Sequence, residues 1–175
     1  MAEDALGRET ADVLAQLVRF NTVNPPGDER ACQEWLASYL RDAGLEVELA
    51  GARPQRPNLV ASLRGEADGP ALGYLSHVDT VLADPADWTH DPWSGEVHDG
   101  FLWGRGALDM KQQTAAEAVA AATLARAGWR VASVRSTGAS LTSALSPRPG
   151  SDACPATPRA RTAKRNVPFS AQQTP

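Results

Sequence analysis

Residues 71–80 read ALGYLSHVDT, and this stretch decides the fold. The run from Ala71 to Val78 has no polar alternation before Ser76, which predicts a strand buried on both faces at the centre of a sheet. His77 and Asp79 come at its carboxyl end and share one face, because strand side chains alternate. Open α/β sheets place their sites at this end of the strands. The stretch therefore predicts a central strand and a candidate site.

Helical patterns precede this strand. Apolar residues recur at helical spacing from Leu6 to Val18, and a proline-rich loop follows at residues 21–27. A second helix is expected to be capped by Asp28 and to end at Gly44 in the left-handed conformation. Its predicted inner face consists of Cys32, Trp35, Leu36, Tyr39, Leu40 and Ala43, which favours a core role for Cys32 over a reactive thiol.

The remaining elements complete an α/β pattern. Residues 45–49 alternate between apolar and acidic side chains, which predicts a strand near a sheet edge, and residues 58–63 predict a second short strand. An alanine-rich helix is expected from Met110 to Ala127, with Gly128 after it. Helices that alternate with buried strands indicate a layered α/β domain.

Composition limits the function classes. The chain has 175 residues, a net charge of −4 and 42% hydrophobic residues, which fits one soluble domain. The charge balance argues against nucleic-acid and membrane partners. Two cysteines cannot form a disulfide framework, and no leader or long apolar run is visible, so a cytoplasmic location is expected.

The average composition hides two different parts. Residues 1–130 contain 20 of the 21 acidic residues and all five tryptophans, whereas residues 131–175 are rich in Ser, Thr, Pro and Ala. Such a segment buries too little apolar surface to offset the entropy of ordering. We expect a structured part over 1–130 and a low-complexity, disordered tail over 131–175, which a frameshift would explain.

Two elements could carry chemistry, and each also has a structural interpretation. The carboxylate of Asp79 can orient the His77 imidazole as a metal ligand or base, or the two can form a plain surface pair. Asp109 follows the glycine turn at residues 104–106 and could bind a metal or simply cap the next helix. Lys111 is expected to be solvated in the first turn of that helix.

Three quoted segments together resemble one enzyme family. They are YLSHVDT (74–80), GRGALDMK (104–111) and the upstream FNTVNPPGDE (20–29). These segments resemble the zinc-dependent amidohydrolases and peptidases of the acetylornithine deacetylase, succinyl-diaminopimelate desuccinylase, aminoacylase and glutamate carboxypeptidase type. The resemblance covers about residues 10 to 130 and implies an incomplete three-layer αβα zinc-exopeptidase-like catalytic domain.

The resemblance also implies a site. His77 matches a zinc ligand, Asp79 matches the catalytic acid that orients it, and Asp109 matches the carboxylate that bridges two zinc ions. The peptide bond between Asp109 and Met110 is expected to be cis. The implied reaction is hydrolysis of an amide bond in an N-acyl amino acid or small peptide by a metal-activated water, and cobalt may replace zinc.

Other parts of the family pattern have no counterpart in the sequence. These are the adjacent glutamate pair with its general base, a further acidic ligand, a late histidine and the domain through which family members often dimerise. Glu117 lies too far along its helix to share a metal with Asp109, and His90 and His98 match no ligand position, His98 being expected on the surface. The alternative is therefore a truncated, inactive fragment with at most weak metal binding.

Overall fold

The computed structural model describes residues 2–66, 71–129 and 134–138. Within these ranges the elements follow in the order α1 (Ala2–Val18), α2 (Arg30–Asp42), β1 (Glu46–Ala50), β2 (Asn58–Leu63), β3 (Leu72–Ser76), a short 3₁₀ helix (Pro85–Asp87), β4 (Val97–His98), β5 (Phe101–Leu102), α3 (Lys111–Arg126) and β6 (Val134–Gly138).

The main sheet has the strand order β1-β2-β6-β3. β6 is antiparallel to β2, with Leu63 opposite Val134, and parallel to β3, with Leu72 opposite Val134. Helix α3 therefore connects two adjacent parallel strands, as in a βαβ unit. This arrangement confirms the predicted α/β class.

The position of β3 differs from the sequence prediction. Among the described strands β3 lies at the edge of the sheet, and the side chains of Leu72 and Leu75 are 53% and 62% exposed. The prediction of a fully covered central strand is therefore wrong for the described part of the chain. An apolar run shows that a strand is hydrophobic, but it does not show where the strand lies in the sheet. The strand order depends on pairing with segments that are distant in the sequence.

The strand between β2 and β3 is β6, which lies in a region where the sequence predicts no ordered element. Val134–Gly138 pair with strands on both sides, so backbone hydrogen bonds hold this segment in the sheet. The rest of the expected tail, residues 139–175, lies outside the described residues, and the predicted boundary after Arg130 stays a prediction.

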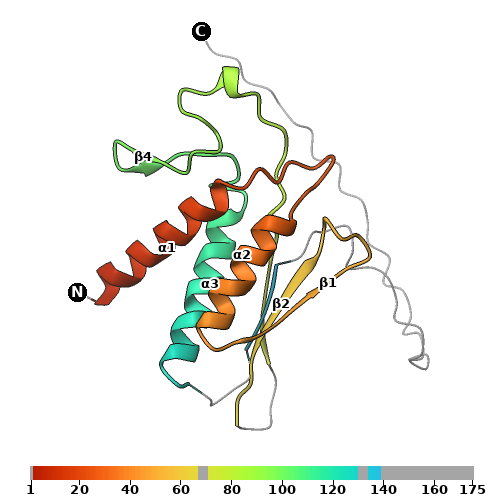
Figure 1. Cartoon of the computed structure of the whole chain (residues 1–175). Helices are drawn as coiled ribbons and strands as arrows, with labels where there is room; N and C mark the ends of the chain where they lie inside the picture. Colours follow the sequence, from red (N-terminus) through yellow and green to blue (C-terminus); the bar gives the residue numbers. More distant parts are fainter. Residues whose placement is uncertain (1, 67–70, 130–133, 139–175) are drawn as a thin grey trace, which may run out of the picture.

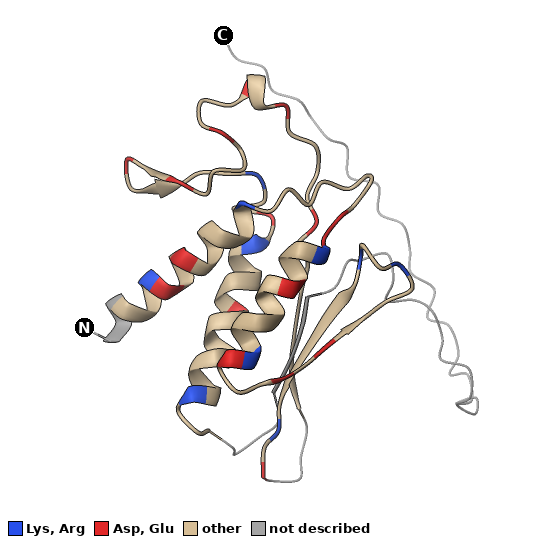
Figure 2. Cartoon of the chain, viewed as in Figure 1, with Lys and Arg blue, Asp and Glu red and all other residues tan. Residues whose placement is uncertain are grey.

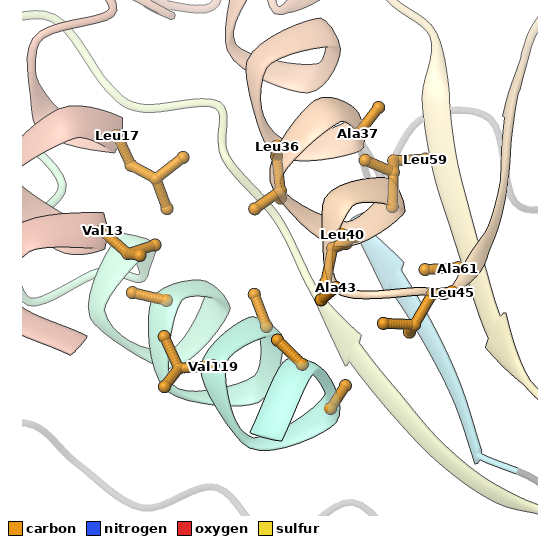
Figure 3. Packing of buried hydrophobic residues seen from close by; sticks show 14 of the residues in the cluster. Val13, Leu17, Leu36, Ala37, Leu40, Ala43, Leu45, Leu59, Ala61 and Val119 are labelled. Atoms are coloured by element: carbon orange, nitrogen blue, oxygen red, sulfur yellow. The ribbon is translucent and has the colours of Figure 1, made fainter. Parts of the chain in front are cut away.

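The helices form one layer beside the sheet, as Figure 1 shows. Helix α1 packs on α3, and α2 packs on β1 and β2. Figure 3 shows Val13 of α1 above α3 and Leu36 of α2 pointing toward the space between the helices, while Ala37 of α2 lies beside Leu59 of β2. The core also contains Leu17, Cys32, Leu40, Ala43, Leu45, Ala61, Leu63, Val78, Ala115, Ala118, Val119, Ala121, Ala122 and Ala125.

The two ends of α2 test the capping predictions. The N-cap residue is Glu29, and its side chain makes no capping hydrogen bond, so the prediction that Asp28 caps the helix is wrong. At the other end Gly44 has φ +96°, and the N–H of Leu45 donates to the oxygen of Leu40 at 3.1 Å. This six-residue closure through a left-handed glycine confirms the predicted helix end.

Charged residues of both signs are interspersed along the helices, as the colours of the backbone in Figure 2 show. No described helix combines the length and the apolar character that crossing a bilayer requires.

Candidate functional site

A pocket of about 350 Å³ lies at the carboxyl end of β3. Its lining includes His77, Asp79 and Asp109, the three residues that the sequence predicts for the site. Asn24, Trp88 and Arg105 line it as well. The structure therefore brings the three predicted residues to one place.

The His77 ring is held from its Nδ1 side. Nδ1 lies 3.1 Å from the backbone oxygen of Asp79, with hydrogen-bond geometry, and 3.1 Å from Asp79 Oδ1. Oδ1 is buried and has no hydrogen-bond partner of its own. Both neighbours are acceptors, so the contacts favour the tautomer with the proton on Nδ1 and leave Nε2 as a free electron-pair donor.

Asp109 lies on the other side of His77. The distance from His77 Nε2 to Asp109 Oδ1 is 3.6 Å, and the Asp109 side chain is 90% exposed. Met110, not Asp109, is the N-cap residue of α3, so the structural alternative of helix capping does not account for Asp109. The Asp109–Met110 peptide bond is cis, as predicted.

The glycine turn brings Asp109 close to β3. Gly106 has φ +85°, and a Cβ at this position would lie 2.7 Å from Thr80 Cγ2. The N–H of Lys111 donates to the oxygen of Gly106 at 2.9 Å, which joins the turn to the start of α3. Only glycine combines this backbone conformation with so close an approach.

The two facing atoms fit a shared metal ion. An imidazole nitrogen and a carboxylate oxygen on one tetrahedral zinc are separated by about 3.4 Å, close to the 3.6 Å between His77 Nε2 and Asp109 Oδ1. Their donor types also suit zinc or cobalt. Within residues 2–66, 71–129 and 134–138, however, no group of three or more His, Cys, Asp or Glu side chains is arranged to hold a metal. The described residues thus supply part of a site.

The other histidines lie outside this pocket. The rings of His90 and His98 stack with a centroid distance of 3.7 Å, and His98 Nε2 lies 3.1 Å from Glu96 Oε2. The His98 side chain is 35% exposed, so it lies at the surface as expected, with one face covered by the stacked ring of His90. Glu117 accepts a hydrogen bond from Gln113 at 2.9 Å, within α3 and away from the pocket lining.

The sequence does not predict the residues that surround Asp79. Asn24 Nδ2 donates to Asp79 Oδ2 at 3.0 Å, and Arg56 Nη2 lies 3.7 Å from the same oxygen. No spacing in the sequence relates these residues, since Asn24 lies in the first loop and Arg56 just before β2. Arg105 is not predicted either, and its guanidinium lies 5.0 Å from the centre of the Trp88 ring.

Comparison with known proteins agrees with the geometry. Residues 73–135 match the model of Peptidase family M20/M25/M40. The chain is 38% identical over 114 residues to succinyl-diaminopimelate desuccinylase 2 of Ruegeria sp. (strain TM1040), covering 65% of this chain and 28% of that protein. It is 41% identical over 114 residues to succinyl-diaminopimelate desuccinylase of Paracoccus denitrificans (strain Pd 1222), covering 65% and 29%. The chain thus spans less than a third of the length of these relatives.

Solved structures show the same fold. Human carnosine dipeptidase 1 superposes with a TM-score of 0.66 at 22% identity, over 78% of this chain and 32% of that one. The M20 family metallo-carboxypeptidase Sso-CP2 of Sulfolobus solfataricus has a TM-score of 0.66 at 19% identity, over 75% and 30%. A dinuclear metal-binding M20 peptidase of Bacillus subtilis has a TM-score of 0.55 at 16% identity, over 77% and 35%. The resemblance of the N-terminal portion to this metallopeptidase family is confirmed.

Proposed function

We propose, from the match of residues 73–135 to the M20/M25/M40 peptidases, that this chain provides part of the metal site of an amide hydrolase. The observation that carries the proposal is the 3.6 Å approach of His77 Nε2 to Asp109 Oδ1 in one pocket. The proposed substrates are N-acyl amino acids or small peptides, in line with the desuccinylase names of the similar curated proteins.

Each residue has a distinct role in this proposal. A zinc ion, or cobalt in its place, would lower the pKa of a water molecule and polarise the amide carbonyl. His77 holds the metal through Nε2, and Asp109 holds it through its carboxylate. Asp79 keeps the proton of His77 on Nδ1, so that Nε2 stays available.

A second candidate is metal binding without hydrolysis. In the described part of the chain, Asp79 and Asp109 are the only carboxylates that line this pocket, and both already have roles. A general base that takes the proton from water would need a further carboxylate or imidazole. Zinc as the metal and the cytoplasm as the location stay predictions from the sequence.

A metal titration tests metal binding, which both candidate functions require. We expect the purified full chain to bind Co²⁺ and the His77→Ala variant to lose this binding. His98→Ala is the matched control, because His98 contacts His90 and Glu96 outside the pocket. Equal Co²⁺ binding by the chain and by both variants would contradict the proposal.

Turnover then separates the two candidates. The chain is incubated with Zn²⁺ or Co²⁺ and with N-succinyl and N-acetyl amino acids and dipeptides, and the released amine is measured. Hydrolysis that disappears in His77→Ala and persists in His98→Ala supports the enzyme. Metal binding without amine release supports the non-catalytic candidate.

A further inference from the structure

The two carboxylate oxygens of Asp79 have different surroundings. Oδ1 lies 3.1 Å from Nδ1 of His77, next to the backbone oxygen of Asp79, which is the hydrogen-bond partner of Nδ1 at 3.1 Å. Oδ2 points to the other side, accepts a hydrogen bond from Asn24 Nδ2 at 3.0 Å and lies 3.7 Å from Arg56 Nη2. The Oδ2 side of the carboxylate is therefore held by the side chains of Asn24 and Arg56.

Arg56 is itself fixed by a buried acid. Its Nε donates to Glu29 Oε2 at 3.1 Å, and its Nη2 lies 3.0 Å from Glu29 Oε1. The side chains of Glu29 and Arg56 are only 1% and 10% exposed. A planar guanidinium held by two parallel contacts has little freedom to turn, and its charge lies between the two carboxylates of Glu29 and Asp79.

Asn24 joins the same network. Arg56 Nη1 donates to Asn24 Oδ1 at 3.4 Å, while the Asn24 amide nitrogen contacts Asp79. The amide group of Asn24 thus accepts from the arginine and donates to the carboxylate. The hydrogen bonds therefore form a chain in which Arg56 donates to Asn24 and Asn24 donates to Asp79.

The first loop leaves room for the guanidinium. Gly27 has φ +77°, and a Cβ at this position would lie 2.6 Å from Arg56 Nε. The N–H of Arg30 donates to the oxygen of Gln55 at 3.0 Å, which joins the start of α2 to the segment that carries Arg56. Backbone contacts therefore place Arg56, independently of any ligand in the pocket.

We infer that Arg56 and Asn24 are positioning residues: by holding Oδ2 they keep both acceptors of Asp79, its backbone oxygen and Oδ1, against Nδ1 of His77, so that His77 keeps its proton on Nδ1 and presents Nε2 to Asp109. The importance of this tautomer for metal binding rests on the proposed function. The tautomer itself is a property of the metal-free chain. Groups that orient a metal-binding histidine from behind change metal affinity by about 10- to 100-fold when they are removed.

The test measures the His77 tautomer by long-range ¹H–¹⁵N NMR of the metal-free full chain. The chain has three histidines, so His77 is assigned with a His77→Gln variant. Spectra are recorded near pH 8.5, about two units above the usual imidazole pKa. We expect Nδ1–H in the parent chain, and a clear increase in the Nε2–H form in Asn24→Ala and in Arg56→Lys.

Two features separate positioning from a general loss of structure. Arg56→Lys keeps the positive charge beside Glu29 but loses the planar fork, and Asn24→Ala keeps the pair of Arg56 and Glu29. Arg64→Lys is the matched control, because Arg64 pairs with Glu46 at 3.1 Å on the exposed surface. The signals of His90 and His98 should stay unchanged in all variants.

The results decide the inference whether or not the chain binds metal. An Nε2–H tautomer in the parent chain, or an unchanged His77 tautomer in both Asn24→Ala and Arg56→Lys, would overturn it. A parent chain with the expected tautomer that binds no Co²⁺ would contradict the proposed function alone. Where Co²⁺ binds, we expect its Kd to rise by up to about 10-fold in Asn24→Ala and Arg56→Lys, which act on His77 through Asp79, and to stay constant in Arg64→Lys.

Discussion

The side chain of Lys111 donates a hydrogen bond from Nζ to the backbone oxygen of Leu17, 2.9 Å away and 94 residues earlier in the chain. A second bond from Nζ reaches the oxygen of Phe20 at 2.8 Å. Lys111 is fully buried, and burial lowers the pKa of its amine to about 8. Lys111, two residues after Asp109, thus joins the start of α3 to the end of α1, where the oxygen of Leu17 also accepts the N–H of Phe20 at 3.3 Å.

We predict that Lys111→Met lowers the free energy of unfolding by about 1–3 kcal/mol, because the oxygens of Leu17 and Phe20 lose the charged donor and the Leu17 oxygen keeps only the N–H of Phe20 at 3.3 Å among the described residues. Urea unfolding followed by circular dichroism measures the change. Gln112→Met is the control. Among the described residues the Gln112 side chain bonds only to the oxygen of Leu108, one turn earlier, at 3.2 Å, so its substitution should change stability by less than about 0.5 kcal/mol. Equal losses in both variants would contradict the role of Lys111.

The glycine turn before Asp109 should tolerate no side chain at residue 106. Gly106 and Gly100 have similar left-handed conformations, with φ of +85° and +83°, so alanine costs about 1–2 kcal/mol of strain at either position. At Gly106 the new Cβ also meets Thr80 Cγ2 at 2.7 Å, whereas at Gly100 nothing lies within 4 Å. We expect a lower Tm for Gly106→Ala than for Gly100→Ala by differential scanning calorimetry. The reverse order would show that the turn is not tightly packed.

Acid should weaken the contact between α1 and α3. Arg126 Nη1 lies 2.6 Å from Glu9 Oε1. The hydrogen bond from Arg126, and to a smaller extent the one from Tyr39, holds the pKa of Glu9 below its usual 4.5. A carboxyl pKa that is lower in the folded state stabilises the fold above about pH 4.5, and this stabilisation disappears as the pH falls through the folded value. Arg126→Gln should therefore destabilise the chain at pH 7, by less than about 1 kcal/mol because the pair is partly exposed, and should have little effect near pH 3.

The control for this prediction is Arg41→Gln. Arg41 contacts the backbone oxygen of Val47 at 3.4 Å rather than a carboxylate. Its substitution should have the same effect at both pH values in chemical unfolding experiments. An Arg126→Gln effect that is equally independent of pH would contradict the assignment to Glu9.

Cys32 should be unreactive in the folded chain. Its side chain is fully buried, and burial raises the pKa of the thiol to about 12. In a Cys154→Ser variant, Cys32 is the only thiol. We expect no labelling by iodoacetamide between about pH 7 and pH 9, because the thiolate is the reactive form, and complete labelling in urea. Stoichiometric labelling of the folded chain by mass spectrometry would contradict the core position.

Local patterns in the sequence predict much of the helical layer and part of the site. Apolar spacing predicts α1 and α2, the alanine-rich composition predicts α3, and the strand predicted at 58–63 coincides with β2. His77 and Asp79 lie two residues apart at the end of one strand, so their contact follows from the local backbone. The cis bond after Asp109 was expected from the family resemblance rather than from any physical pattern.

Tertiary structure alone decides the strand order and the surroundings of the site. β6 lies between β2 and β3 because its backbone groups pair on both sides, and such pairing is nearly independent of side-chain type. Burial of Lys111 and the contacts of Arg56 and Asn24 with Asp79 join segments far apart in sequence. Residue spacing determines only which side chains share a face of one helix or strand, whereas these contacts exist only after the segments have packed together.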